Sequence, residues 1–355
     1  MLIYRQILKA RARRWRKAPG VAVPTVCVGN VTVGGTGKTP HTEMILGLLQ
    51  ASDRWGNSPV AVLSRGYKRS SRGFQIVERD STAAFAGDEP LQIKRKFPAV
   101  TVAVDKDRVE GCARLTAELP AEQGRAAELI VLDDAFQYNR LHASLNIVLV
   151  DWNRPVFEDS LLPFGRLRDL PQRIFDADII IVSKCPLGID LSEKLSFAEK
   201  LRLGSYDASE CSALCPSGKK ITLLFSHMEY CPLEPVFPDA DARYSYSKTA
   251  VTITGIANDA PMKAWLSDSY RLVAGLSYPD HHRFRKADLR EMASAVKHYP
   301  TAAFVTTEKD AQRLRDRSDV PDGLKERLFA LPIKVEFNSD AELEVLQSAL
   351  DSLKG

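Results

Sequence analysis

The residues with the clearest potential for chemistry form a glycine-rich stretch, GNVTVGGTGKTP, at positions 29–40. An apolar run at 24–28 precedes it, and a helical pattern of apolar residues begins at Thr42. A strand, a glycine turn, Gly-Lys-Thr and a helix, in this order, are typical of a phosphate-binding loop. Glycine lets backbone N–H groups approach anionic oxygens closely, and the helix N-terminus points its dipole at them. The stretch therefore predicts a nucleotide-phosphate site built from Gly34, Gly35, Thr36, Gly37, Lys38 and Thr39.

Two side chains of this loop have expected roles of their own. Lys38 is expected to reach the β- and γ-phosphates of the nucleotide, and the Thr39 hydroxyl is expected to hold Mg²⁺. The loop departs from the common pattern at Thr32, because a glycine usually stands six residues before the lysine. An ordinary glycine turn before a helix is the alternative, but GGTGKT at a strand-to-helix turn favours the phosphate site.

A pair of carboxylates follows a second apolar strand. Asp133 and Asp134 come directly after the apolar segment 129–132. A carboxylate at such a strand end can hold Mg²⁺ directly or through water. Aspartate commonly follows a strand, so the pair alone is a weak signal, and the phosphate-binding loop at Lys38 is what favours a functional role. Together the two stretches predict a magnesium–nucleotide site.

Three further residues have both a functional and a structural interpretation. Asp107 is a candidate base and Arg108 a candidate charge clamp, although a helix N-terminus beside a surface arginine is the simpler interpretation. His281 lies in a strand-to-helix turn next to Asp280. An Asp–His pair there can serve acid–base chemistry, whereas a lone histidine is usually structural.

Two basic loops are expected near strand ends. Residues 64–69 read SRGYKR, and residues 166–168 read RLR. Guanidinium groups in such loops can bind a phosphate of the substrate, and solvated surface charge is the alternative. The predicted substrate contacts are Arg65, Arg108 and Arg168.

Short apolar runs between helical segments indicate the fold that positions these residues. The pattern predicts an α/β protein with a doubly wound, mostly parallel sheet. Ligands of such sheets bind at the carboxyl ends of the strands, where Thr39, Asp107 and Asp133 can converge on one crevice. The expected strands are 24–28, 60–63, 74–77 (an edge strand), 100–104, 129–132, 145–150 and 179–182.

The second half of the chain predicts a smaller α/β domain. Residues 221–225 and 233–237 are expected to form a two-stranded excursion, and a polar stretch at 239–248 follows. Strands alternate with helices again from residue 251. We expect an amphipathic helix at 1–20, a P-loop domain at 21–217, a two-stranded linker at 218–248 and the smaller domain at 249–355.

Composition excludes several classes of protein. The 355 residues are 45% hydrophobic and 26% charged, as in a soluble globular protein. No apolar run reaches the ~18 residues of a membrane-spanning helix, and no signal-peptide core is visible. The six cysteines are scattered and form no CxxC pair. This spacing predicts free thiols in a reducing compartment and no zinc site.

The net charge of +4 conceals a basic N-terminus. Eight Lys and Arg residues precede the first acidic residue, Glu43, and leave −4 for the remainder of the chain. This distribution argues against a nucleic-acid partner, which needs basic residues spread over a face. Residues 2–17 fit a helix with an apolar stripe, a basic face and Trp15. Such a helix suits an anionic membrane surface, and packing on the domain explains it equally well.

The motifs occur in an order that resembles one enzyme family. GNVTVGGTGKTP, LSRGYKR, GDEP, DKDR, LDDAFQ, LPFGRLRD, TGIAN, PDHHRF and TTEKD follow one another between residues 23 and 310. Together they are similar to tetraacyldisaccharide 4′-kinase, the lipid A 4′-kinase of Gram-negative bacteria. The resemblance implies Mg²⁺-dependent phosphoryl transfer from ATP to the 4′-hydroxyl of a lipid A disaccharide 1-phosphate, by a protein peripheral to the cytoplasmic face of the inner membrane. It also implies a RecA-like N-terminal domain and a two-stranded linker.

The resemblance also implies roles for single residues. Asp107 resembles the catalytic carboxylate and His281, in the other domain, its partner, so that their pairing requires the domains to close. The phosphate and metal residues keep the roles given above: Lys38, Thr39, Asp133 and Asp134.

Three departures from the family pattern are visible. Ala135 stands where a glycine usually follows the paired acids, and LPFGRLRD stands where LPAGPLRE is common. The second change leaves the substrate contacts of that loop open. The N-terminal helix is short compared with the usual anchor of the family, which implies a weaker hold on the membrane.

Two other functions are compatible with a nucleotide site. A P-loop GTPase acting as a regulatory switch would carry Asn/Thr-Lys-x-Asp after a late strand, but Pro186 occupies the place of that aspartate in SKCP. A nucleotide-gated scaffold without chemistry needs no base, and a turnover measurement separates it from an enzyme.

Overall fold

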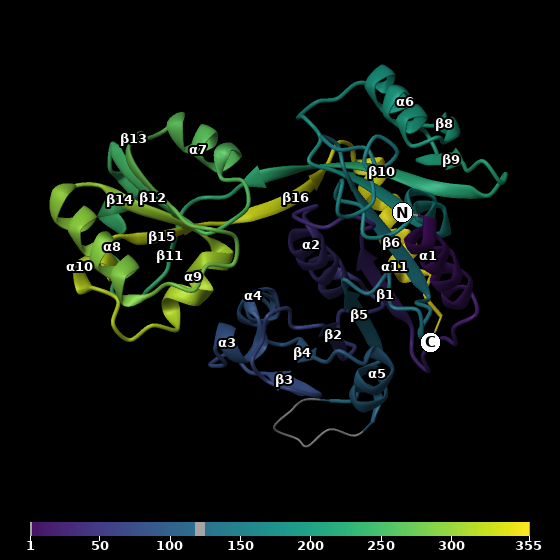
Figure 1. The fold of residues 1–355 in the computed structure, drawn as a ribbon, viewed down its shortest axis with the longest axis horizontal. Coiled ribbons are helices and arrows are strands. Elements are labelled where there is room, and N and C mark those ends of the chain that lie inside the picture. Colours follow the sequence, from purple (N-terminus) through teal and green to yellow (C-terminus); the bar gives the residue numbers. More distant parts are fainter. Residues whose placement is uncertain (1, 118–124, 355) are drawn as a thin grey trace.

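The computed structural model describes residues 2–117 and 125–354, and these residues form two lobes, each built on its own sheet (Figure 1). The larger sheet has the strand order β3-β4-β2-β5-β1-β6-β7-β10-β9-β8, with β16 paired to β10. The neighbours from β4 to β10 along this order are parallel. The smaller sheet has the order β11-β15-β14-β12-β13. The predicted α/β class with a doubly wound, mostly parallel sheet is confirmed.

The five strands at the centre of the larger sheet, β2, β5, β1, β6 and β7, are wholly buried. β3 lies at the edge of the sheet, as expected for 74–77, and it runs antiparallel to β4. A strand buried on both faces needs a continuous apolar sequence, and the apolar segments that predicted these strands have this property. The strands are β1 (Thr25–Gly29), β2 (Val60–Ser64), β3 (Gln75–Val77), β4 (Thr101–Val104), β5 (Leu129–Asp133), β6 (Leu145–Asp151), β7 (Ile179–Ser183), β8 (Gly204–Asp207), β9 (Ser212–Leu214) and β10 (Lys220–Tyr230).

Helices cover both faces of this sheet. One core contains side chains from α1 (Leu2–Trp15), α5 (Arg108–Thr116) and α6 (Leu191–Lys200). The opposite core contains side chains from α2 (Lys38–Ala51), α4 (Asp88–Lys96) and α11 (Asp340–Asp351). Successive residues of a strand point to opposite faces, so Cys27 enters the first core and Val28 the second. The short helices of this lobe are α3 (Ala83–Ala86) and the 3₁₀ helix η2 (Pro171–Asp176).

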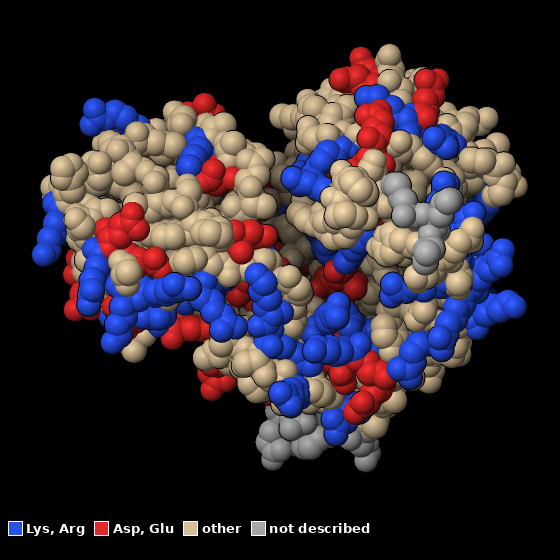
Figure 2. Space-filling view, viewed as in Figure 1, with Lys and Arg blue, Asp and Glu red and all other residues tan. Residues whose placement is uncertain are grey.

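The N-terminal helix packs on the larger lobe. Leu8 and Trp15 of α1 are buried, and the Trp15 ring centroid lies 5.3 Å from that of Phe136. The basic side chains Lys9 and Arg13 remain exposed, and Lys and Arg gather along the edge of the molecule where α1 lies (Figure 2). Leu8 and Trp15 of the apolar stripe therefore serve packing, whereas Ile7 and the basic face are accessible. None of the described helices is long and apolar enough to cross a membrane.

The smaller lobe repeats the α/β pattern on a reduced scale. A notch separates it from the larger lobe on the face shown in Figure 2. Its strands are β11 (Glu234–Pro235), β12 (Thr249–Thr254), β13 (Arg271–Ser277), β14 (Ala303–Thr307) and β15 (Leu328–Leu331). Its helices are α7 (Ala260–Ser267), α8 (Lys286–His298), α9 (Glu308–Arg315), α10 (Asp322–Lys325) and the 3₁₀ helix η3 (Ala242–Tyr246).

Two strands connect the lobes, but they are not the pair that the sequence predicted. The partner of β10 is β16 (Ile333–Phe337), and the two run antiparallel from Ser226 to Tyr230. The expected return strand at 233–237 is wrong, because β11 pairs with β15 in the smaller sheet instead. Pro332 separates β15 from β16, since proline offers no N–H for a ladder, and this frees the chain to change sheets there.

The C-terminal helix belongs to the larger lobe, so the predicted end of the smaller domain at residue 355 is wrong. Leu346 and Leu350 of α11 lie in the core of the larger lobe. The indole N–H of Trp55 donates a 3.0 Å hydrogen bond to the Leu350 carbonyl. The chain thus returns along β16 to the larger lobe, and the span 249–355 does not form one domain.

Candidate active site

The glycine-rich stretch forms a turn between β1 and α2 whose shape the protein itself fixes. Gly34 and Gly37 have φ values of +96° and +83°, in the region that side chains other than glycine rarely adopt. Asn30 Nδ2 donates to Thr36 Oγ1 at 2.6 Å, and Ser183 Oγ donates to the Thr36 carbonyl at 2.9 Å. Fixed backbone N–H groups before a helix N-terminus form an anion cradle.

The paired carboxylates lie beside this loop because β5 is the neighbour of β1. Val28 is in register with Asp133. The buried carboxylate of Asp133 accepts a 2.9 Å hydrogen bond from Ser64 at the end of β2. Burial and the neighbouring Asp134 raise the pKa of Asp133 to about 6. Adjacent parallel strands therefore bring the two predicted motifs together.

Asp134 provides the negative charge that faces Lys38 and Arg168. Its backbone has φ +53°, and its carboxylate lies 3.8 Å from Lys38 Nζ and forms an ion pair with Arg168. Burial opposes its ionisation, but Lys38 and Arg168 hold the pKa of Asp134 below its usual range. Asp134 is therefore ionised at neutral pH and orients both cations.

The oxygen groups at this place fit a magnesium ion. The Thr39 hydroxyl and two carboxylates are hard ligands of the kind that Mg²⁺ prefers. Asp133 is buried and forms no ion pair within residues 2–117 and 125–354, so a cation would relieve the cost of its charge. Those residues contain no cluster of three or more His, Cys, Asp or Glu side chains able to hold a metal. The ion would thus need phosphate and water oxygens as well, as is usual for Mg²⁺.

Arg168 reaches the site from the loop that follows β6 and contacts Asp134 and Asn30. Its guanidinium donates to Asp134 Oδ2 at 3.0 Å and also to Asn30 Oδ1. The backbone of this loop is tied to the glycine-rich stretch, since Val33 N donates to the Arg166 carbonyl at 2.7 Å. Arg168 therefore holds parts of the site in place, beside its predicted role in contacting substrate.

Asp107 lies at the N-terminus of α5 and is surrounded by donors. It accepts from the Val109 N–H at 3.0 Å, from the Tyr138 hydroxyl at 2.6 Å and from Arg140 at 2.5 Å. The Tyr138 hydrogen bond and the Arg140 contact lower its pKa to about 2. Asp107 is thus a carboxylate at neutral pH whose lone pairs are largely engaged.

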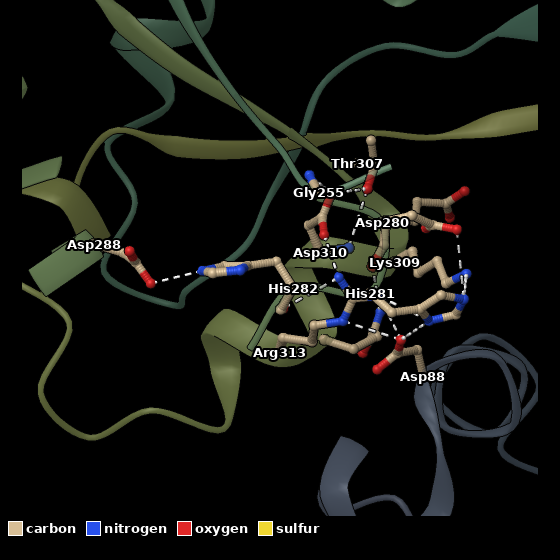
Figure 3. A network of polar contacts seen from close by, with 12 residues as sticks. Asp88, Gly255, Asp280, His281, His282, Asp288, Thr307, Lys309, Asp310 and Arg313 are labelled. Atoms are coloured by element: carbon tan, nitrogen blue, oxygen red, sulfur yellow. Dashed lines mark hydrogen bonds and ion pairs between the residues drawn. The ribbon is translucent and has the colours of Figure 1, made fainter. Parts of the chain in front are cut away.

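His281 lies across the lobe interface, and the structure does not bring it to Asp107. Its Nδ1 atom is 3.1 Å from Asp88 Oδ2, and its Nε2 atom is 3.2 Å from Lys309 Nζ (Figure 3). Arg313 donates to the same Asp88 oxygen from Nε at 3.0 Å. The imidazole is therefore oriented by Asp88 rather than by Asp107, while the Asp280 carboxylate of the Asp–His pair lies 3.8 Å from its Nε2 atom.

The other predicted substrate contacts occupy unlike environments. Arg65 is exposed at the end of β2. Arg108 is buried and donates to the Asp105 carbonyl at 2.9 Å, with its guanidinium 5.9 Å from the Tyr138 ring centroid. Arg108 thus supports the loop after β4, whereas the Arg65 side chain is accessible.

Comparison with known proteins decides the family. Residues 1–351 match the family model described as tetraacyldisaccharide-1-P 4′-kinase. The chain belongs to this family. It is 41% identical to the tetraacyldisaccharide 4′-kinase of Parabacteroides distasonis over 327 residues, or 90% of this chain and 83% of the relative. The Porphyromonas gingivalis protein of the same name is 40% identical over 328 residues, or 90% and 85%.

A solved structure shows that the fold is also that of the tetraacyldisaccharide 4′-kinase family. The crystal structure of LpxK from Aquifex aeolicus, described as an "apo" form in complex with ATP, matches with a TM-score of 0.68. The match covers 99% of this chain and 96% of that chain at 24% identity. The likeness confirms the α/β architecture with its mostly parallel sheet.

Several site residues in this member of the kinase family were missed by sequence reasoning. Asp88 belongs to the GDEP motif and Lys309 to the TTEKD motif, but the sequence predicted no role for either residue. Four such motifs, GDEP, TGIAN, PDHHRF and TTEKD, meet at the interface drawn in Figure 3. Their order along the chain carried no signal of this convergence. The other missed residues are Asn30, Ser64, Tyr138, Arg140 and Arg313.

Proposed function

We propose that this protein transfers the γ-phosphate of ATP to the 4′-hydroxyl of tetraacyldisaccharide 1-phosphate in lipid A biosynthesis. The observation that carries the proposal is the match of residues 1–351 to this kinase family. The glycine-rich loop, Lys38 and the Asp133–Asp134 pair provide the parts that phosphoryl transfer requires.

Each part of the site has a proposed task. The backbone of residues 34–37 holds the phosphates, and Lys38 neutralises charge that develops on the transferring group. Thr39, Asp133 and Asp134 would hold Mg²⁺, which supplies charge neutralisation at the phosphate oxygens. Arg168 fixes Asp134. Arg65 is the proposed contact for a phosphate of the lipid, and its exposure supports this role.

Asp107 is the proposed acceptor of the hydroxyl proton, with His281 as its partner. A loose transition state asks little of the nucleophile, so a weakly basic carboxylate suffices. Arg140 is half exposed and can swing away from Asp107 when the sugar hydroxyl arrives. A contact between Asp107 and His281 requires the lobes to adopt an arrangement other than the one described here.

The proposed site of action is the cytoplasmic face of the inner membrane, with the protein held peripherally. The exposed basic side chains of α1 suit an anionic lipid surface. The helix keeps Leu8, Ala12 and Trp15 in the domain and leaves Ile7 exposed. Attraction of charge, rather than insertion of the whole apolar stripe, is therefore the proposed contact.

The test is a transfer assay. The protein is incubated with Mg²⁺, tetraacyldisaccharide 1-phosphate and ATP labelled in its γ-phosphate, and the lipid fraction is separated. We expect label in a bisphosphorylated lipid, and none when the 4′-position of the acceptor is already phosphorylated. Two results would contradict the proposal and favour a regulatory nucleotide switch. One is label that appears only as free phosphate, and the other is hydrolysis of GTP as fast as ATP with no label in the lipid.

A further inference from the structure

A buried histidine links the phosphate-binding loop to a strand that joins the lobes. His41 lies in the first turn of α2 and is fully buried. Its Nδ1 atom is 2.7 Å from the Gly37 carbonyl oxygen, and its Nε2 atom is 2.9 Å from Ser226 Oγ. Because a carbonyl oxygen only accepts, Nδ1 carries the proton of the neutral ring, and Nε2 is an acceptor for the serine hydroxyl. The hydroxyl is closer to Nε2 than to its other acceptor, the Val182 carbonyl oxygen at 3.4 Å. One neutral side chain thus bridges the two elements.

Ser226 marks the point where β10 leaves the larger sheet. Up to Phe225 the strand pairs with β7, and from Ser226 onward it pairs with β16. Both strands then run to the smaller lobe (Figure 1). Ser226 is still tied to the larger lobe, since its carbonyl accepts from the Cys185 N–H at 2.9 Å and its Oγ lies 3.4 Å from the Val182 carbonyl oxygen of β7. A rotation of the smaller lobe about this junction therefore pulls on Ser226 against these contacts.

Gly37, on the other side of the bridge, is the residue directly before Lys38. It has left-handed backbone geometry with φ +83°. A Cβ at Gly37 would collide with the methyl group of Met228, which lies two residues beyond Ser226 on β10. The connecting strand therefore contacts the loop through one polar and one apolar side chain.

We propose that His41 is a positioning residue that couples the placement of the smaller lobe to the geometry of the phosphate-binding loop. The inference rests on the proposed phosphoryl transfer, which requires acceptor and nucleotide to be bound together. Acceptor binding that shifts β10 displaces Ser226, and His41 transmits the shift to the Gly37 carbonyl and so to Lys38. By thermodynamic linkage, acceptor and nucleotide then change each other's affinity by the same factor.

The experiment measures this coupling factor. It is the ratio of the dissociation constants of a non-hydrolysable ATP analogue without and with tetraacyldisaccharide 1-phosphate in detergent micelles. We expect a factor of at least about fivefold in the unmodified protein and a factor near one in Ser226→Ala. His41→Asn should also give a factor near one, because its amide keeps a donor for Gly37 but does not reach Ser226. Affinity for the analogue alone should change by less than about twofold in Ser226→Ala.

Ser183→Ala is the matched control. Ser183 also donates to the loop, at the Thr36 carbonyl, but from β7 within the larger sheet. Its loss should weaken analogue binding equally with and without acceptor and leave the coupling factor unchanged. A factor of one in the unmodified protein, or an unchanged factor in Ser226→Ala, overturns the inference. Label transfer is measured on the same preparations, so an absent coupling in a protein that phosphorylates the lipid refutes the coupling alone.

Discussion

The carboxylate of Asp88 and the imidazole of His281 meet across the interface between the lobes, with 3.1 Å between Oδ2 and Nδ1. Asp88 begins α4 in the larger lobe, and its position at a helix N-terminus favours its charge. Burial opposes ionisation, but the hydrogen bonds from His281 and Arg313 lower the pKa of Asp88 to about 2. The arrangement fixes both the contact between the lobes and the orientation of the imidazole.

Replacing Asp88 tests whether that orientation matters for catalysis. Asp88→Asn keeps the size of the side chain but removes the charge that holds His281 and Arg313. We expect kcat to fall at least about tenfold, while the dissociation constant of an ATP analogue stays unchanged, because the phosphate loop is not touched. Steady-state kinetics of lipid phosphorylation and analogue titration measure the two effects.

The control variant is Asp316→Asn, which weakens the interface between the lobes at a contact that does not involve His281. Asp316 accepts from Arg95 of α4 at 3.5 Å and from the backbone of α3, and it does not contact His281. Asp316→Asn should lower the melting temperature without the loss of kcat. Equal losses of kcat in both variants would show that interface strength, and not the orientation of His281, is what matters.

The magnesium–nucleotide site could be predicted from the sequence because its parts depend on local rules. A glycine turn after β1 and a carboxylate after β5 meet whenever the two strands are parallel neighbours, as Val28 and Asp133 are. The contact of Asp88 with His281 joins residues 193 positions apart and depends on how the lobes dock. The antiparallel pairing of β10 with β16 likewise leaves no local pattern. Those features had to come from the structure.

Asp107 is tested as the proton acceptor. Asp107→Asn should lower kcat at least about 100-fold with little change in nucleotide affinity, as loss of a general base does. His281→Ala should lose less, and the double variant little more than Asp107→Asn alone if the two act as one unit. Additive losses would separate their roles, and near-normal kcat in Asp107→Asn would remove the base assignment.

A buried glutamate predicts how stability depends on pH. Glu43 of α2 accepts from Gln92 at 2.8 Å and from Lys96 at 2.7 Å, and Lys96 also contacts Glu308 of the smaller lobe. Burial raises the pKa of Glu43 to about 7 from 4.5, against the opposing charge of Lys96. The folded state therefore binds more protons than the unfolded state between those values, and stability falls as pH rises through this window.

Glu43→Gln should remove that part of the pH dependence. Between pH 4.5 and pH 7 the unfolding free energy of the variant should fall by about 2 kcal/mol less than that of the unmodified protein. Urea unfolding at both pH values measures the difference, in which the other titrating groups largely cancel. Parallel pH profiles of the two proteins would show that Glu43 is ionised throughout.

The basic face of α1 is predicted to provide membrane contact. Because Leu8 and Trp15 anchor the helix in the core, deletion of residues 1–17 would expose apolar surface as well as remove charge. Replacing exposed Lys9, Arg13 and Lys17 by glutamine isolates the charge. We expect sedimentation with anionic vesicles to weaken by about 1 kcal/mol for each charge, and high salt to mimic the replacement. Unchanged sedimentation would limit α1 to its packing role.

Lys38→Ala is predicted to abolish turnover while the fold persists. The ammonium lies 3.8 Å from Asp134, yet Arg168 remains paired with that carboxylate after the change. No buried charge is therefore left alone, and the melting temperature should shift by only a few degrees. No other residue is expected to replace the Lys38 ammonium in stabilising charge on the transferring phosphoryl group, so kcat should fall at least about 100-fold. Lipid phosphorylation and thermal unfolding are measured on the same sample, and a folded Lys38→Ala protein with near-normal kcat would refute the assignment of the phosphate site.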